Sequence, residues 1–221
     1  MNSDFRLGLV AGLKSEARAL ASASPWPVAV AGGSAERAEA MARALAAAGA
    51  TALISVGIAG ALIPGLQPGM LVVGDAVIGP DGLQMPVDAA LVAALGLPAN
   101  VRTVRGSLAG SDTMVTSAAA KHELAGRSGA IAVDMESHGV ARAARALGLP
   151  FAVLRAIADP ADRAVPPSAA VGMDAEGNTR PLAVMLALLK RPGDLPGLIA
   201  LGRDAASATA TLKRLAASLA G

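Results

Sequence analysis

The sequence of 221 residues has no cysteine and no tyrosine, and it contains only one tryptophan and two phenylalanines. The absence of cysteine excludes disulfide bonds and thiolate metal sites, and it is compatible with a reducing compartment. Because aromatic side chains are so rare, the core has to be built from alanine, leucine, valine and isoleucine. The sequence also lacks the aromatic and basic residues that are interleaved in nucleic-acid-binding segments.

An excess of one charge is missing too, since 19 basic and 17 acidic residues give a net charge of +2. This balance indicates no nucleic-acid partner. His122 and His138 are separated from each other and from acidic clusters in the sequence, so we expect no metal site. The G-x-S-x-G motif of many serine hydrolases is absent as well.

No segment of the sequence predicts a membrane span or a secretory signal. The N-terminus has no basic region followed by a long apolar stretch, and Arg, Lys, Gly or Pro interrupts the apolar runs elsewhere. We therefore expect a soluble, cytoplasmic protein. Its mean hydropathy of +0.52 is nevertheless high for such a protein.

The length and the 53% of hydrophobic residues suit one domain, residues 1–221, with a sizeable core. Short apolar runs alternate with alanine-rich helical stretches, which predicts an α/β fold. We expect a three-layer αβα architecture with a mostly parallel or mixed twisted sheet. The expected strands are 6–11, 28–31, 51–56, 70–77, 102–109, 130–134 and 151–158, and the expected helices are 14–22, 35–49, 116–126, 135–147, 180–191 and 194–216.

Ligands of such sheets bind outside the carboxyl ends of the strands. Polar or glycine-rich sequence follows four of the expected strands, at residues 57–60, 110–113, 134–137 and 158–162. Gly57 and Gly60 would let the backbone approach a ligand, although a plain turn explains them equally well. The long segment 159–180, rich in proline, alanine and glycine, predicts a functional loop.

Three charged residues near the end of the last expected strand are candidates for chemistry. Asp159 directly follows very apolar sequence, and partial desolvation would favour the protonated form that a general acid needs. On spacing alone a structural role is favoured, either as a cap of the next turn or in an ion pair with Arg155 or Arg163. Arg155 itself lies within the apolar strand and needs a partner, which would be a carboxylate or an anionic substrate. Glu136 begins a helix, where the helix dipole alone would explain an acidic residue.

A second candidate site is the start of the helix 35–49. The amides of Gly33 and Ser34 at this N-terminus would suit a phosphate, and Arg37 lies one turn further on. Ordinary capping of the helix by Ser34 is the simpler interpretation of this segment taken alone.

Motifs in the second half of the chain resemble those of a known family. They are Val133-Asp134-Met135-Glu136-Ser137, Leu149-Pro150-Phe151 and Arg155-Ala156-Ile157-Ala158-Asp159-Pro160-Ala161-Asp162. A Met-Glu dipeptide, a helix, an apolar strand and Arg-x-Ile-x-Asp follow one another as in the nucleoside phosphorylase superfamily, which includes methylthioadenosine/adenosylhomocysteine nucleosidases. Residues 8–13 with Glu16, and residues 55–60, resemble the same family, so the resemblance covers most of the chain.

The resemblance implies roles for individual residues. Asp159 would hydrogen-bond N7 of a purine and protonate the leaving base, while Glu136 would hold the ribose hydroxyls. Met135 would pack against the sugar, Arg155 would lie near the nucleophile, and Glu16 would help to activate water in a nucleosidase. Departure of the base leaves an oxocarbenium-like sugar, whose charge nearby carboxylates stabilise.

Further contacts to the ribose or the base are expected from Asp112, Gly60 and Met114. Met114 stands where the nucleosidases have an aromatic residue that stacks on the base. Methionine can also cover a purine face, although less specifically.

A second departure from the nucleosidases concerns the nucleophile. Ile58 stands where they have a serine near the nucleophile, which favours a nucleophile other than water. We therefore expect inorganic phosphate as a co-substrate and no cofactor. The candidate phosphate ligands are Gly33, Ser34, Arg37 and Arg155.

The segments VDMESH, LPFAVLRAIADPADRAVPPSA and LLKRPGDLPGL resemble, more narrowly, the hopanoid-associated phosphorylases. This resemblance implies phosphorolysis of adenosylhopane, with release of adenine, in hopanoid biosynthesis. A triterpenoid substituent on the 5′ carbon would need a wide apolar groove, which would explain the high mean hydropathy. The family also implies a homo-oligomer.

The last 41 residues, 181–221, predict two amphipathic helices with five basic and two acidic side chains. Packing on the sheet explains most of their apolar residues. We expect the junction Arg191-Pro192-Gly193 and the leucines beside it to form an apolar rim, which would make peripheral contact with the inner face of a membrane.

Two other functions remain open at this point. One is hydrolysis of methylthioadenosine, adenosylhomocysteine or a related nucleoside by the same fold. The other is non-catalytic binding of a nucleoside or a lipid, which the presence of both Glu136 and Asp159 disfavours.

Overall fold

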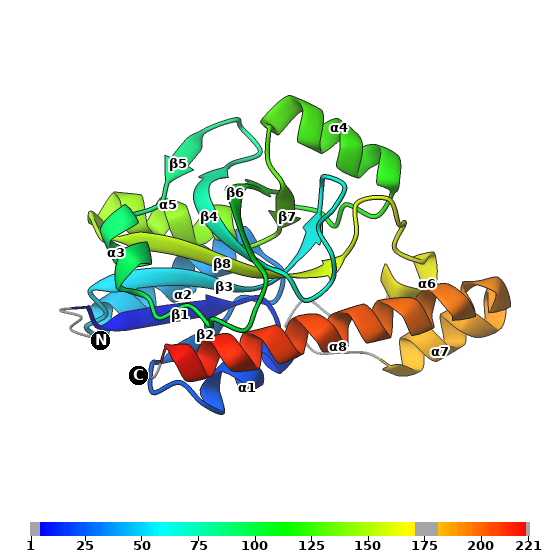
Figure 1. Cartoon of the computed structure of the whole chain (residues 1–221), viewed down its shortest axis with the longest axis horizontal. Coiled ribbons are helices and arrows are strands. Elements are labelled where there is room, and N and C mark those ends of the chain that lie inside the picture. Colours follow the sequence, from blue (N-terminus) through cyan, green and yellow to red (C-terminus); the bar gives the residue numbers. More distant parts are fainter. Residues whose placement is uncertain (1–4, 171–180, 220–221) are drawn as a thin grey trace.

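Helices pack on both faces of one mixed β-sheet in the computed structural model, which describes residues 5–170 and 181–219 (Figure 1). The strands are β1 (Leu7–Ala11), β2 (Val28–Val30), β3 (Ala52–Ala61), β4 (Leu71–Ile78), β5 (Gln84–Pro86), β6 (Thr103–Gly110), β7 (Ala132–Asp134) and β8 (Phe151–Asp159). The helices are α1 (Lys14–Ala21), α2 (Ala35–Ala47), α3 (Ala89–Ala94), α4 (Ala118–Ser128), α5 (Ser137–Leu147), α6 (Pro167–Ala170), α7 (Pro181–Lys190) and α8 (Leu195–Ser218). The predicted α/β class with a mixed sheet is confirmed.

Five of the strands close into a ring. β3 pairs with β8, β8 with β4, β4 with β6, β6 with β7, and β7 again with β3. The β3–β7 and β4–β8 pairs are antiparallel, and they complete the ring. β1 and β2 extend the sheet beyond β3 in parallel, while β5 is added antiparallel to β4.

The expected elements agree with the observed ones to within two residues at each end, with the exception of β3. β3 continues to Ala61, so the interpretation of residues 57–60 as a turn after the strand is wrong. Gly57 and Gly60 pair in extended conformation with Arg155 and Asp159 of β8. A Cβ at Gly57 would lie 2.5 Å from the Arg155 guanidinium, and a Cβ at Gly60 would lie 3.2 Å from an Asp159 carboxyl oxygen. Glycine is therefore needed here because it leaves room for these two side chains.

Short elements fill segments for which the sequence pattern predicts no regular structure. β5 and α3 lie between β4 and β6, and Asp88 begins α3 by accepting a hydrogen bond from the Leu91 N–H at 2.7 Å. α6 lies within the expected loop 159–180, of which residues 171–180 lie outside the described part of the chain.

Two apolar layers hold the helices on the sheet. One layer joins α1, α3 and α8 to β1, β3 and β8, and the other joins α2 and α5 to the opposite face. Leu53 and Ile54, which are neighbours on β3, face opposite layers, as do Val153 and Leu154 on β8. This burial on both faces explains why these strands read as continuous apolar runs.

The C-terminal helices pack on the sheet only in part. The second half of α8 is anchored by buried residues such as Ala208, Leu212 and Leu215. The first half of α8 and the antiparallel α7 extend past the sheet as a hairpin (Figure 1). The hairpin exposes 47–76% of the surface of each of five large apolar residues, Met185, Leu186, Leu189, Leu195 and Ile199. Among the described helices, none is both long enough and apolar enough to cross a membrane.

Candidate active site

A cavity of about 310 Å³ lies where several strands end, a size that suits a small molecule. All four segments that follow expected strands, at 57–60, 110–113, 134–137 and 158–162, contribute to its wall. The complete lining is Leu13, Glu16, Ile58, Ala59, Gly60, Thr113, Met114, Val115, Val133, Asp134, Met135, Glu136, Ala158, Asp159, Val165, Ala169, Leu201 and Ala205.

Acidic and apolar residues share this lining. The carboxyl groups belong to Glu16, Asp134, Glu136 and Asp159. The segment around α6 and the first half of α8 contribute apolar residues, among them Val165, Ala169 and Leu201. The cavity can therefore hold a ligand that is polar at one part and apolar at another.

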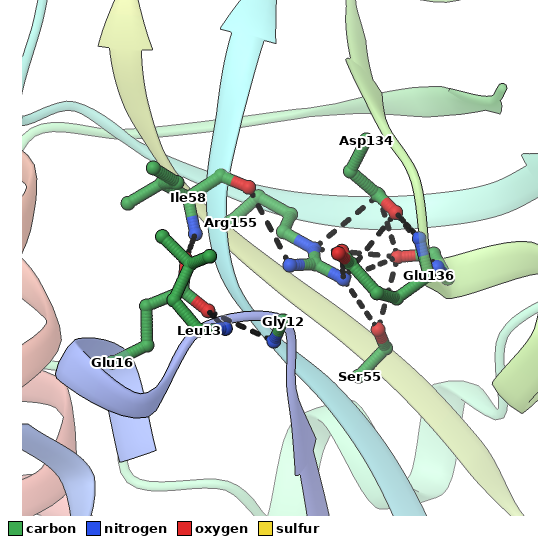
Figure 2. Close-up of polar contacts among 9 residues, drawn as sticks. Gly12, Leu13, Glu16, Ser55, Ile58, Asp134, Glu136 and Arg155 are labelled. Atoms are coloured by element: carbon green, nitrogen blue, oxygen red, sulfur yellow. Dashed lines mark hydrogen bonds and ion pairs between the residues drawn. The ribbon is translucent and has the colours of Figure 1, made fainter. Parts of the chain in front are cut away.

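The guanidinium of Arg155 lies beside the cavity, fully buried, and organises the acidic residues (Figure 2). It forms ion pairs with Asp134 at 3.3 Å and with Glu136 at 3.4 Å. It also donates hydrogen bonds to the hydroxyl of Ser55 at 2.6 Å and to that of Ser137 at 3.1 Å. The sequence predicts a carboxylate or an anionic substrate as the partner of Arg155, and its partners are the carboxylates of Asp134 and Glu136. Arg155 itself does not line the cavity.

Asp134 is a site residue to which the sequence motif assigns no role. One of its carboxylate oxygens accepts hydrogen bonds from the N–H groups of Glu136 and Ser137 at 2.8 and 2.7 Å, and the other accepts from the Ser137 hydroxyl at 2.6 Å. Asp134 thus fixes the start of α5 while it pairs with Arg155. Its place directly before the Met-Glu dipeptide is the signal that could have identified it.

Glu16 reaches the cavity from the first turn of α1. Its carboxylate accepts hydrogen bonds from the N–H groups of Gly12 and Leu13 at 2.9 Å and of Ile58 at 3.0 Å (Figure 2). These bonds join the end of β1 to β3. Burial raises the pKa of Glu16, while the nearby Arg155 and the three amides lower it.

Glu136 is a second buried carboxyl group of this cluster whose pKa is raised. Burial raises the pKa of its carboxyl group to about 8, the positive charge of Arg155 lowers it, and the negative charges of Asp134 and Glu16 raise it further. One guanidinium faces three carboxyl groups, so the cluster cannot be fully neutralised by ion pairing alone. At neutral pH Glu136 is therefore mostly protonated.

Asp159 contacts a residue that the sequence pattern does not indicate. The ammonium group of Lys121, on α4, is fully buried and bonds to the carboxylate of Asp159. The suggested ion pairs of Asp159 with Arg155 or Arg163 are wrong, because Arg155 pairs with Asp134 and Glu136, and Arg163 pairs with Asp204. A lysine in an alanine-rich helix looks like a solvated residue, and only the position of α4 over the end of β8 reveals its role.

Asp112 contacts His138 of α5. The ring Nε2 of His138 lies 3.0 Å from a carboxyl oxygen of Asp112, a contact that the sequence does not indicate. Asp112 is not part of the cavity wall, whereas Met114 and Met135 are. The contact of Asp112 with ribose or base therefore stays a prediction.

Gly33, Ser34 and Arg37, the residues proposed for phosphate, are not among those that line the cavity. Ser34 accepts a hydrogen bond from the N–H of Arg37 at 3.3 Å, so the simpler interpretation as a helix cap is confirmed. The Arg37 guanidinium donates to the carbonyls of Ala31 and Gly32, both at 2.8 Å. Phosphate binding by Gly33, Ser34 and Arg37 stays a prediction.

Comparison with known proteins identifies the family. A family model described as the phosphorylase superfamily matches residues 22–190, which is most of the chain. The chain belongs to the phosphorylase superfamily. A search of curated proteins finds no match to the sequence.

Several hydrolases of known structure share the fold of this chain. The 5′-methylthioadenosine/S-adenosylhomocysteine nucleosidase of Neisseria meningitidis, in complex with methylthio-immucillin-A, has a TM-score of 0.74 and 18% identity, with 96% of this chain and 97% of that chain covered. The futalosine hydrolase of Helicobacter pylori has a TM-score of 0.68 and 19% identity, with 95% and 96% covered. At these identities the likeness shows the shared fold, and the hopanoid-associated subgroup stays a prediction.

The raised pKa of Glu136 predicts a pH-dependent stability. Between pH 5 and pH 8 the folded chain keeps a proton that the unfolded chain releases, so the free energy of unfolding falls as the pH rises. Glu136→Gln removes this contribution. We expect the wild type to lose at least about 1 kcal/mol more stability than the variant between pH 5 and pH 8, measured by urea unfolding.

The matched control is Glu123→Gln, because the side chain of Glu123 is exposed on α4. This variant should follow the wild type at both pH values. Equal losses of stability in the wild type and Glu136→Gln would show that Glu136 does not hold the proton.

Proposed function

We propose that the chain cleaves the N-glycosidic bond of an adenosine modified on its 5′ carbon and releases adenine. The observation that carries this proposal is that Asp159, Glu136 and Glu16 line one cavity, although they come from three distant parts of the sequence. The structurally similar Neisseria nucleosidase was solved with a nucleoside analogue, which supports a nucleoside as the ligand class.

Asp159 is the proposed general acid. Burial raises its pKa, which favours the protonated form, and the bonded Lys121 lowers it. A carboxyl group that burial keeps protonated, and whose ionised form Lys121 stabilises, can donate a proton to N7 of the purine. A protonated base is the better leaving group, so this step would promote cleavage of the glycosidic bond.

The proposed role of Glu136 and Glu16 is to stabilise the sugar. Loss of the base leaves positive charge on the ribose, and that charge favours the ionised forms of nearby carboxyl groups. Glu136 would hydrogen-bond the ribose hydroxyls, and Met135 would pack against the sugar. Arg155 does not line the cavity, so its proposed role is to hold Asp134 and Glu136 in position.

The apolar part of the cavity supports an apolar substituent on the 5′ carbon. Val165, Ala169, Leu201 and Ala205 offer no charged group to such a substituent. Adenosylhopane, which the resemblance to the hopanoid-associated phosphorylases implies, has this chemistry. It is therefore our proposed substrate.

The charges around the cavity support water, rather than the expected phosphate, as the nucleophile. Among the described residues, no lysine, arginine or histidine lines the cavity, whereas four carboxylic acids do. The cations behind the wall, Arg155 and Lys121, already bond to protein groups. A phosphate anion would therefore meet no cationic side chain in the described wall, whereas an uncharged water could be hydrogen-bonded by Glu16. We therefore propose hydrolysis, with phosphorolysis as the alternative that the family name supports.

The α7–α8 hairpin supports the proposed peripheral contact with a membrane. Its exposed apolar residues flank two exposed basic residues, Lys190 and Arg191. Apolar and basic side chains together favour the interface of an anionic bilayer. Because α8 also lines the cavity, through Leu201 and Ala205, an amphiphilic substrate would lie close to this surface.

Replacement of the proposed acid should stop the reaction. In Asp159→Asn the side chain keeps its size but cannot donate an acidic proton, so we expect adenine release from a 5′-modified adenosine to slow by at least about 100-fold. Adenine is measured by liquid chromatography. Asp162→Asn, in the same loop but exposed and outside the cavity, is the control and should stay near wild type. Turnover of Asp159→Asn close to wild type would refute the assignment.

The nucleophile is identified by the sugar product. If water attacks, adenine release does not depend on phosphate, and the sugar formed in ¹⁸O-labelled water carries the label at its anomeric hydroxyl. Mass spectrometry of the product with and without phosphate checks this. A sugar 1-phosphate, formed only in the presence of phosphate, would establish phosphorolysis instead.

Membrane contact is tested with anionic lipid vesicles. We expect the wild type to co-sediment with them, and the double substitution Leu186→Ser/Leu189→Ser to bind at least about tenfold more weakly, because apolar surface would no longer be removed from water. Leu83→Ser, at an exposed leucine outside the hairpin, should bind like the wild type. Absence of wild-type binding at low salt would overturn the contact.

A further inference from the structure

Lys121 is a fully buried lysine whose donors are all engaged around Asp159. Its ammonium group bonds to Oδ2 of Asp159 and donates to the carbonyls of Pro160 at 2.8 Å and of Arg163 at 2.9 Å. These three bonds account for the three hydrogens of the ammonium group. A buried ammonium group is costly unless it is paired and hydrogen-bonded, and the three bonds around Asp159 meet this requirement.

The other charged groups that face Asp159 largely compensate one another. Asp204 of α8 raises the pKa of Asp159 and Arg163 lowers it, but these two residues are paired with each other. The larger influences are burial, which raises the pKa, and the hydrogen bond and charge of Lys121, which lower it. Across the sheet Asp159 faces Gly60 of β3, which carries no charge. Among the described residues, Lys121 is thus the cation in direct contact with Asp159.

We propose that Lys121 is a positioning residue for base release, which fixes the carboxyl group of Asp159 through Oδ2 and stabilises the carboxylate that remains once the proton has left. This inference rests on the proposed function. In the step concerned, the proton on Oδ1 of Asp159 passes to N7 of the purine. The electron pair of the glycosidic bond goes to the base, and water adds to the sugar with loss of a proton.

The same lysine also fixes the chain beyond Asp159. Its bonds to the carbonyls of Pro160 and Arg163 connect this segment to α4, and the N–H of Val165 donates to the carbonyl of Thr116 at 2.8 Å. Val165 lines the cavity. One ammonium group therefore holds both the carboxyl group of Asp159 and the segment after it, which forms part of the cavity wall.

The test compares Lys121→Met with the wild type over pH. Loss of the ammonium charge should move the alkaline limb of kcat/KM for adenine release upward by about 1 pH unit or more, because Asp159 then keeps its proton to higher pH. The plateau of kcat should fall by at least about tenfold, because the remaining carboxylate is no longer stabilised. Arg127→Met, at an exposed position of the same helix, should change neither quantity.

A second substrate separates this effect from general damage to the site. A 4-nitrophenyl riboside with the same 5′ group has a leaving group that needs no protonation. We expect Lys121→Met to cleave it at a rate within about threefold of the wild type, while adenine release is slowed. Equal slowing with both substrates, or an alkaline limb that does not move, would overturn the proposal.

Two further variants keep the outcome unambiguous. If Asp159→Asn releases adenine like the wild type, the proposed function fails; if Asp159→Asn is inactive and Lys121→Met shifts nothing, only the role of Lys121 fails. Should Lys121→Met not fold, the double variant Lys121→Met/Asp159→Asn decides, because it removes both charges. A folded double variant supports coupling of the two residues, and an unfolded one shows that Lys121 serves the scaffold independently of Asp159.

Discussion

The ion pairs of one buried guanidinium hold the candidate active site together. Arg155 belongs to β8, and its partners come from β3, from the end of β7 and from the start of α5. Since a buried arginine without partners would be strongly destabilising, these elements can pack only in the arrangement that brings Asp134, Ser137 and Ser55 to it. The antiparallel pairing of β3 with β7 provides this arrangement, because it places Asp134 beside the last part of β3.

The single positive charge of this guanidinium is smaller than the negative charge that the three surrounding carboxyl groups would carry if all were ionised. Asp134 and Glu136 form ion pairs with Arg155, and the charge of Arg155 also favours the ionised form of Glu16. Burial is the main reason why the pKa of Glu136 is raised, and the negative charges of Asp134 and Glu16 raise it further. Positive charge on a sugar would favour ionisation of these carboxyl groups, which agrees with a cationic sugar in the proposed reaction. Among the described residues no cationic side chain lines the cavity to bind a phosphate, which agrees with water as the proposed nucleophile.

Much of this site can be predicted from the sequence, because the motifs lie at strand ends and strand ends meet. Glu136 and Asp159 are found in this way, whereas Glu16 is found only through the family resemblance. The need of Arg155 for an anionic partner follows from its apolar neighbours. Lys121 cannot be found, because burial of a lysine depends on where its helix packs. Gly57 and Gly60 are misassigned to a turn because glycine serves a turn and a crowded strand equally well. The closed ring of strands is also hidden, since apolar runs carry no information on strand direction.

Asp159 and Glu136 are both buried carboxyl groups on one cavity, and what distinguishes them is how their cations are shared. Asp159 has the ammonium group of Lys121 as its direct partner, whereas Glu136 shares Arg155 with Asp134, which is itself negative. Burial raises both pKa values, but only for Asp159 is the compensating positive charge undivided. Two acids whose surroundings differ in this way can take different roles. Asp159 is the better proton donor to a leaving base, and Glu136 keeps its proton until positive charge on the sugar draws it into the ionised form.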